Sequence, residues 1–310
     1  MITKEFIEFK NYGKCIKLSN GIIDAIATLE MGPRIVFFGF IGGENIMNTE
    51  KDKFPKISGE KYDKHYYKGA YWTIYGGHRL WASPESSPQT YYPDCNAVEY
   101  NLTDSGVVLT PPPQTENGLQ MQMELIMRDN EPTMDVKHSM TNIADKEQDL
   151  ALWALSVSAQ DGILIIPTNT NDTGLLHNRV ISVWSYTDMS DDRVFYGKKY
   201  VTLRQDRNAT TPMKFGFDLN EGTTYYLLGN SVFKKKYYPN HPNGRYPDGG
   251  VSFETYNCGL FLENETLSEQ KIMAPGSTET HLETWTMLKK PQELNERDND
   301  SIDAFVKALN

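Results

Sequence analysis

The stretch from residue 71 to residue 85 combines side chains that serve proton transfer and ligand binding. Two glycines precede His78 and Arg79, so the backbone can turn tightly and hold an imidazole and a guanidinium on a rigid base. Trp72 and Trp81 flank this pair, and indole rings can stack on the C–H face of a sugar ring. The imidazole can donate a proton to a ring oxygen, and Arg79 can hold hydroxyl groups. The alternative is structural: Arg79 pairs with a nearby carboxylate and His78 satisfies a loop carbonyl.

A carboxylate that could act as a general base lies between residues 259 and 268. Glu263 ends an apolar run, and alternation along a strand places it on one face with Phe261. Partly apolar surroundings make a carboxylate a usable base, so Glu263 is the leading candidate for this role. The alternative is a salt bridge from Glu263 to Arg79 or to Lys234.

Loop-like stretches supply further candidate contacts to a ligand. Residues 234–250 are rich in turn formers and aromatic rings, which is typical of a binding rim. Lys234, Tyr246 and Asp248 are the candidate ligand contacts in this stretch, and a solvated basic bulge is the alternative. Arg179 lies among mixed rings and charges that suit either the wall of a groove or a surface network.

Short strands must position these side chains. Segments of about five to eight residues with alternating or β-branched character recur between turn formers, and this pattern predicts an all-β antiparallel sandwich. Strands are expected at residues 22–29, 34–40, 97–102, 106–109, 119–127, 133–141, 150–158, 163–166, 225–228, 251–256, 259–262 and 281–287. The polar turn at residues 128–132 makes its two flanking strands a predicted hairpin.

The organisation of the chain indicates one domain. No linker, repeat or low-complexity tract interrupts residues 1–310, so a single domain with a C-terminal extension from about residue 290 is expected. Ile302, Phe305, Val306 and Leu309 recur at helical spacing after possible capping residues, which predicts a short C-terminal helix.

Composition excludes several classes of function. The formal net charge is -10 and the longest basic tract is three lysines, which argues against nucleic-acid binding. The chain has no phosphate-binding glycine loop, serine-hydrolase elbow or zinc-protease motif, and its three cysteines are far apart, so neither a metal nor another cofactor is expected. The N-terminus lacks a secretory signal and no run approaches the ~18 apolar residues of a membrane span, so a cytoplasmic location without membrane contact is expected. The expected partner is a small carbohydrate, and a homodimer stays open.

Seven motifs along the chain carry a family resemblance. They are Leu18–Ile22, Met31–Ile35, Gly76–Trp81, Tyr246–Gly249, Leu260–Ser268, Met273–Ser277 and His281–Trp285. Together they resemble the galactose mutarotase-like superfamily, which includes the aldose 1-epimerases, and in particular a bacterial branch of it. The likeness covers nearly the whole chain. Its sharpest part is similar to the epimerase stretch in which a strand carries the catalytic glutamate and a Pro-Gly turn follows.

The resemblance implies a large β-supersandwich with a sugar-binding concave face, and it carries the general-base role onto Glu263. Epimerases place a catalytic histidine in a strand resembling residues 150–158, where this chain has Trp153-Ala154-Leu155. Trp153 is therefore a candidate sugar contact, and the family's proton donor is missing unless His78 replaces it.

Three functions are compatible with these residues. In the first, an epimerase or mutarotase, Glu263 removes the proton of the anomeric hydroxyl while His78 protonates the ring oxygen. The second is a non-catalytic binder or sensor of a sugar or glycoconjugate, which the missing strand histidine favours. The third is a hydrolase or lyase in which Glu263 pairs with Asp248 or Glu254.

Overall fold

Alternation of buried and half-exposed side chains fixes the inward face of each strand. In β10 (Leu119–Met127) every odd-numbered side chain is buried and every even-numbered one is partly exposed. The antiparallel register with β11 (Thr133–Asn142) sets Leu125 opposite Val136. An apolar row of this kind stabilises a sheet when a second layer covers it.

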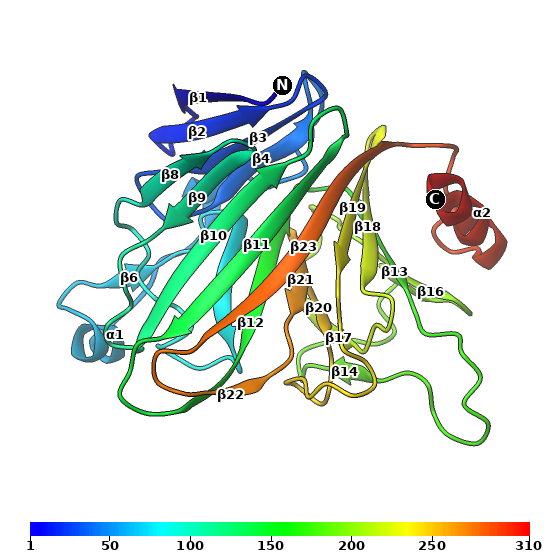
Figure 1. Cartoon of the computed structure of the whole chain (residues 1–310). Coiled ribbons are helices and arrows are strands. Elements are labelled where there is room, and N and C mark those ends of the chain that lie inside the picture. Colours follow the sequence, from blue (N-terminus) through cyan, green and yellow to red (C-terminus); the bar gives the residue numbers. More distant parts are fainter.

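The computed structural model describes residues 1–310 and contains two large antiparallel sheets (Figure 1). The 11-stranded sheet has the order β1 (Thr3–Glu8), β2 (Lys14–Ser19), β3 (Ile23–Thr28), β4 (Ile35–Phe40), β7 (Gly77–Ser83), β12 (Gln148–Ser158), β21 (Leu262–Leu267), β20 (Phe253–Asn257), β17 (Met213–Phe217) and β14 (Ile181–Val183), and β22 (Lys271–Met273) also pairs with β12. The 10-stranded sheet has the order β15 (Val194–Tyr196), β16 (Tyr200–Arg204), β13 (Ile163–Pro167), β18 (Thr223–Leu228), β19 (Ser231–Tyr237), β23 (Thr278–Lys289), β11, β10, β9 (Gly106–Thr110) and β8 (Glu99–Thr103).

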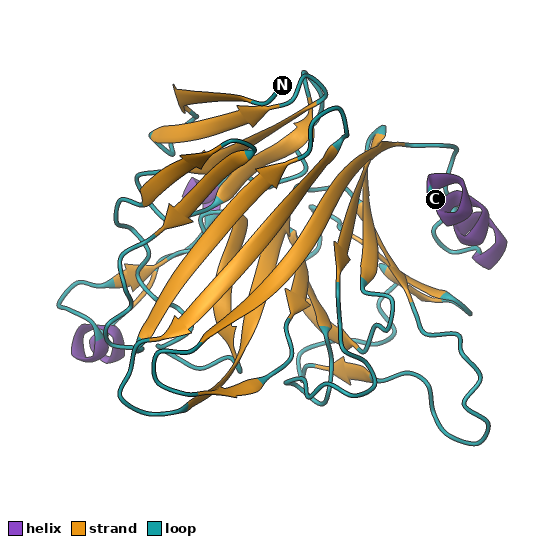
Figure 2. Ribbon diagram, in the orientation of Figure 1, coloured by secondary structure: helices purple, strands orange, loops and turns teal.

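The remaining elements are short and lie at the periphery (Figure 2). They are the ribbon of β5 (Ile57–Ser58) and β6 (Tyr71–Trp72), a 3-10 turn at Lys51–Lys53, and the helices α1 (Glu60–His65) and α2 (Asn299–Leu309). Neither helix has the length and apolar character needed to cross a membrane.

The main apolar core lies between the two sheets. Phe38 of β4, Phe233 of β19 and Trp285 of β23 meet there, with ring centroids 5.2 to 5.6 Å apart. Aromatic pairs at this separation add to the free energy of folding beyond the area they bury. The core therefore holds the inner faces of the two sheets together, and the side chains on their outer faces can contact other elements or a ligand.

Most of the predicted strands are present in the structure. The hairpin of β10 and β11 is confirmed, and the two consecutive strands predicted near the start of the chain are β3 and β4. Two predictions are wrong. Residues 258–261 form a turn closed by the bond from the Cys258 amide to the Phe261 carbonyl, so β21 begins only at Leu262. Residues 234–237, predicted as the start of a loop, belong to β19 instead, where Lys235 is buried against a carboxylate from β23.

The predicted C-terminal helix is confirmed as α2. Ile302, Phe305 and Val306 are buried against the outer face of the 10-stranded sheet. The Asp298 side chain accepts a hydrogen bond from the Ser301 amide at 2.8 Å, so it caps the helix N-terminus.

Replacing Asp298 with alanine is expected to lower the free energy of unfolding by about 1 kcal/mol, because one amide of the first helical turn loses its partner. Urea denaturation checks this value. The matched control is Asp300→Ala, since Asp300 also lies in the first turn but does not cap it. Equal losses for both variants would show that charge, and not capping, stabilises this end of the helix.

Candidate functional site

Five of the residues predicted to contact a ligand line one cleft. The cleft has a volume of about 410 Å³ and lies on the face of the 11-stranded sheet that points away from the 10-stranded sheet. The five are Glu263, Arg79, Trp72, Trp81 and Trp153. The structure thus brings together residues that are nearly two hundred positions apart in the chain.

Strand alternation explains this convergence. Successive side chains of a strand point to opposite faces, so Arg79 and Trp81 of β7 share one face. β12 lies beside β7 with Trp153 opposite Trp81, and β21 lies beside β12 with Glu263 opposite Val157. The outward residues of three neighbouring strands therefore form the floor of the cleft.

An ion pair lies at the floor of the cleft. Arg79 Nη2 donates to Glu263 Oε1 at 3.0 Å, and both side chains are almost fully buried. The Arg79 guanidinium carbon lies 4.0 Å from the Trp81 ring centroid and 5.6 Å from that of Trp72. The salt bridge expected as the alternative role of Glu263 is therefore present. It occupies only one carboxylate oxygen, and Glu263 still lines the cleft.

A second buried cation, Lys214 of β17, was not among the residues predicted from sequence. Its Nζ lies 2.8 Å from Glu254 Oε2 and 3.7 Å from Glu265 Oε2. The same atom lies 4.5 Å from the Trp153 ring centroid and 4.6 Å from that of Trp184. A lysine at an alternating position inside the otherwise apolar Met213–Phe217 is the signal that could have identified it.

Burial and mutual contact shift the pKa values of Lys214, Glu254 and Glu265. Burial raises the pKa of Glu265 to about 7, although the Lys214 ammonium opposes the rise. Burial also raises the pKa of Glu254 well above its usual range, again against Lys214. Burial disfavours the Lys214 ammonium, but Glu265 and Glu254 outweigh this and leave the pKa of Lys214 above its usual value. Lys214 is therefore a permanent cation, and its partners bind protons unusually well.

Aromatic side chains complete the walls of the cleft. Tyr91, Tyr186, Tyr256, Phe54 and Phe261 line it together with the three tryptophans. The Tyr91 hydroxyl donates to the exposed carboxylate of Glu85, which lies at the rim. The cleft therefore combines apolar rings with a small number of charged groups, which is the usual composition of a small-molecule site.

The structure corrects the placement of His78. His78 precedes Arg79 in β7, so its side chain points to the opposite face of the sheet, where it is fully buried between the two sheets. It contacts Ser156 Oγ through Nδ1 and His138 Nε2 through Nε2, both at 2.8 Å. Burial, helped by the charge of Lys235, lowers the pKa of His78 well below its usual value. His78 therefore does not face Glu263 across the cleft.

The interior network around His78 has a defined direction. His138 Nδ1 donates to the His281 carbonyl at 3.1 Å, so its neutral imidazole accepts at Nε2 from His78. His78 then accepts at Nδ1 from Ser156 Oγ, which in turn accepts from Lys235 Nζ at 2.8 Å.

This network includes the one group with the spacing of metal ligands. Nitrogens of His78 and His138 and an oxygen of Glu283 lie within 4.8 Å of one another. The Lys235 ammonium, 3.0 Å from Glu283 Oε1, already supplies a cation beside this carboxylate. Since internal hydrogen bonds satisfy both imidazoles, the group fits a structural network better than a metal centre.

Two predicted contacts from the 234–250 stretch lie away from the cleft. Lys234 Nζ donates to Asn310 Oδ1 at 2.6 Å, beside α2. The Tyr246 hydroxyl accepts from the Asn240 amide at 2.6 Å and lines a separate pocket. Neither residue lines the cleft, because each is held by a local partner in another part of the molecule.

Two further predicted contacts also lie elsewhere. Asp248 is exposed in a turn where its φ is 52°, and its carbonyl accepts a hydrogen bond from the Ser182 hydroxyl. Arg179 donates to the carbonyls of Asn169 and Lys198 at 2.7 and 2.8 Å. These contacts belong to surface loops, as the alternative interpretation of Arg179 expected.

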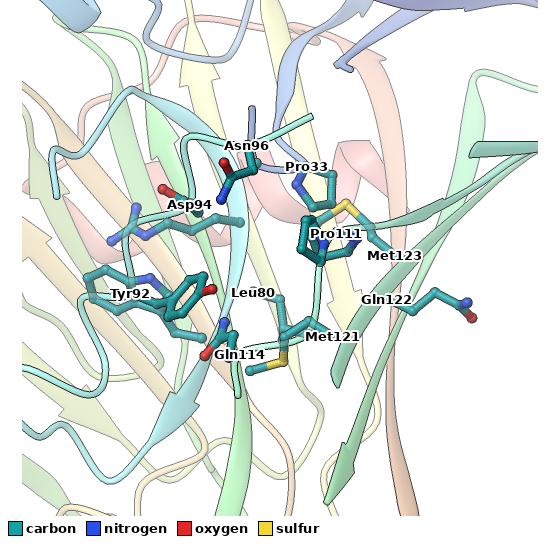
Figure 3. Close-up of a pocket in the computed structure, with 14 residues that line it drawn as sticks. Pro33, Leu80, Tyr92, Asp94, Asn96, Pro111, Gln114, Met121, Gln122 and Met123 are labelled. Atoms are coloured by element: carbon teal, nitrogen blue, oxygen red, sulfur yellow. The ribbon is translucent and has the colours of Figure 1, made fainter. Parts of the chain in front are cut away.

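A second, much smaller cavity of about 40 Å³ lies beside Arg79, between β7 and β10 (Figure 3). Leu80, Met121 and Met123 line it together with Asp94, whose Oδ1 has no hydrogen-bond partner within the protein. A single water needs roughly 10–15 Å³ of such space, so this cavity has the size for a few water molecules and not for a sugar. The aromatic cleft, which has the buried ion pair at its floor, is therefore a better candidate for a functional site than this cavity.

Comparison with known proteins gives a structural result and no sequence match. No protein-family model matches the chain, and no curated protein sequence does. A galactose mutarotase-like protein from Lactobacillus casei ATCC 334 has a TM-score of 0.58 at 9% identity, over 88% of this chain and 100% of that one. A galactose mutarotase-like protein from Clostridium acetobutylicum has a TM-score of 0.53 at 11% identity, over 93% and 98%.

A larger protein contains the same architecture. A TPR-domain containing protein from Parabacteroides distasonis ATCC 8503 has a TM-score of 0.58 at 11% identity, over 90% of this chain, and the chain spans only 48% of its length. Likeness at such low identity establishes the fold alone. The predicted all-β sandwich of the galactose mutarotase-like kind, with its short C-terminal helix, is confirmed.

Proposed function

We propose that this chain, which has the galactose mutarotase-like fold, binds a carbohydrate in the aromatic cleft of its 11-stranded sheet. One observation carries the proposal: the buried pair of Arg79 and Glu263 lies at the floor of a cleft walled by aromatic rings. Sugars present C–H faces that pack on rings and hydroxyls that need charged donors and acceptors. The cleft offers both kinds of contact.

The unused hydrogen-bonding capacity of the ion pair supports this function. Arg79 Nε and Nη1 are buried and have no hydrogen-bond partner within the protein. Buried donors without a partner are rare in folded proteins, because each costs about 1–3 kcal/mol. A ligand hydroxyl could donate to the remaining oxygen of Glu263, whereas the two Arg79 nitrogens have no exposed surface and become reachable only if the side chain shifts. The volume of about 410 Å³ also falls in the range of small-molecule sites, roughly 300–1,000 Å³.

Binding without catalysis fits the cleft better than anomer interconversion does. An epimerase needs an acid that contacts the sugar and gives up a proton near neutral pH, but no histidine lines the cleft and Glu265, whose pKa is about 7, is fully covered beneath it. Lys214 does line it, but its raised pKa makes it a poor proton donor. A pair of carboxylates for hydrolysis is also disfavoured, because Asp248 lies outside the cleft and Glu254 is held by Lys214.

The test is thermal stabilisation by a panel of monosaccharides and disaccharides. A sugar at about 100 times its dissociation constant should stabilise the fold by roughly 2.7 kcal/mol. Glu263→Gln should weaken that binding by about 10- to 100-fold, because a hydrogen bond to a charged group contributes roughly 1.5–3 kcal/mol. Polarimetry of the same sugars should show no faster mutarotation with the protein than without it.

Matched tyrosines give the control. Tyr186→Ala, in the cleft, should weaken binding several-fold, whereas Tyr100→Ala, on β8, should leave it intact; the two side chains have similar exposure, 47% and 40%. Absence of stabilisation by any sugar would overturn the proposal. Mutarotation that is accelerated by the protein and lost in Glu263→Gln would replace binding with catalysis as its function.

A further inference from the structure

The cleft and its floor contain more carboxylates than cations. Four carboxylates and two cations meet here: Glu85, Glu254, Glu263 and Glu265 with Arg79 and Lys214. Glu254 and Glu265 lie under the cleft on neighbouring strands, directly opposite each other in the register of β20 and β21. Burial favours the protonated forms of Glu254 and Glu265, so the negative charge that a ligand meets in the cleft comes from Glu263 and Glu85, which both line it.

Both cations already have carboxylate partners inside the protein. Arg79 pairs with Glu263, and Lys214 lies between Glu254 and Glu265. An anionic ligand would have to compete with these buried carboxylates for each cation, and like charges brought together in a low-dielectric site cost several kcal/mol. The cleft is therefore unsuited to a sugar phosphate or a sugar acid.

The carboxylates, in contrast, have acceptor capacity left over. Glu263 is 7% exposed, and its Oε2 makes no hydrogen bond while the residue lines the cleft. Glu265 Oε1 also has no partner, but it is fully covered beneath the cleft and a ligand does not reach it. At the rim, Glu85 accepts only the Tyr91 hydroxyl. A donor-rich, positively charged group of a ligand would meet unused acceptors here.

Tyr186 lines the same cleft as Glu85 and Glu263. Burial is the first cause that raises the pKa of Tyr186 to about 12, and the charges of Glu265, Glu85 and Glu263 add to it against Lys214. The Tyr186 ring is half exposed and lines the cleft. Aromatic faces also attract cations, by about 0.5–2 kcal/mol. The surroundings of this ring therefore combine two features that stabilise an ammonium group.

We propose that the carbohydrate bound in this cleft is an amino sugar, whose protonated amine lies between Glu263, Glu85 and the Tyr186 ring. This inference rests on the proposed function, because it names the chemical class of the ligand of the same site. The amine donates to the two carboxylates, and the sugar ring packs on the aromatic walls. The free carboxylate capacity of the cleft and the engaged state of both cations carry the inference.

Calorimetric titration with matched sugars tests it. Glucosamine and galactosamine are compared with glucose, galactose, their N-acetylated forms and glucose 6-phosphate at pH 6.5. At least one amino sugar should bind 10-fold or more tightly than its neutral parent and its N-acetylated form, and the phosphate should bind least. The preference should shrink as salt is added, because screening weakens a charge interaction at a partly open site.

Variants separate this inference from the proposed function. Glu85→Gln keeps an acceptor for Tyr91 but removes the rim charge. The ratio of the dissociation constant of the neutral sugar to that of its amino sugar should therefore fall several-fold. Glu293→Gln, at a glutamate that is 93% exposed and outside the cleft, should leave that ratio intact. Equal binding of amino and neutral sugars, or tighter binding of the phosphate, overturns the inference while the proposed function stands. Failure of every sugar to bind overturns both.

Discussion

Glu283→Gln is expected to lower the free energy of unfolding by about 3–5 kcal/mol, because it leaves the Lys235 ammonium buried without a counter-charge. Lys235 Nζ lies 3.0 Å from Glu283 Oε1, and neither side chain has any exposed surface. Glu283 also accepts hydrogen bonds from Trp285 Nε1 at 2.7 Å and from the Thr266 hydroxyl. Urea denaturation at pH 7 measures the loss.

Two further variants make this result specific. The double variant Lys235→Met/Glu283→Gln should regain much of the lost free energy, since an apolar replacement of a buried pair is often close to neutral. Lys271→Met breaks the partly exposed pair with Glu279 and should cost less than about 1 kcal/mol. If Glu283→Gln were no more destabilising than Lys271→Met, the network would not depend on this charge pair.

The pair also explains why His78 belongs to the interior. Lys235 donates to Ser156, and the chain of hydrogen bonds runs from there through His78 to His138. The imidazoles stay neutral because burial disfavours their charged forms and the Lys235 ammonium adds to this effect. His78 therefore contributes to joining the two sheets, and its position is incompatible with proton transfer in the cleft.

Sequence alone predicted the strands better than it predicted the directions of side chains. Pattern reasoning located β10, β11 and β12 almost to the residue, because their alternation is strong and turn formers bound them. The same period of two shows that His78 and Arg79, as neighbours in a strand, must point to opposite faces. The glycines before them favoured the prediction of a turn over that of a strand, so the opposite directions of the two side chains were not predicted.

The sequence offered Arg79 as one of two possible salt-bridge partners of Glu263. It did not decide between Arg79 and Lys234, since the pairing depends on β12 lying between β7 and β21. Lys214 and Lys235 were missed for a related reason. Lysines are mostly exposed in proteins, and these two are buried because carboxylates from neighbouring strands neutralise them. Which carboxylates lie beside each lysine depends on which strands pair in the folded chain, and the local sequence does not show this.

Lys214→Met is expected to make stability depend strongly on pH, because it removes the cation that neutralises Glu254 and Glu265. Both carboxyls then bind protons more tightly in the folded state than in the unfolded chain, where the pKa is near 4.5. With more protons bound when folded, stability rises as pH falls toward that value, by up to about 1.4 kcal/mol per pH unit for each carboxyl. Because the pKa of Glu265 is already about 7 in the wild type, the loss relative to wild type should develop mainly above pH 7, reach about 3–5 kcal/mol at pH 8 and be largely absent at pH 5.

The measurement is the difference in unfolding free energy between Lys214→Met and wild type, taken by urea denaturation from pH 5 to pH 8. Taking the difference cancels groups common to both proteins, including the buried histidines. Lys214→Met/Glu265→Gln removes one of the two titrating carboxyls and should halve the slope. A difference that does not change with pH would mean that Glu254 and Glu265 reach water when Lys214 is absent. In that case water would reach the floor of the cleft. The ion pairs of Lys214 would then no longer explain why the site disfavours anions.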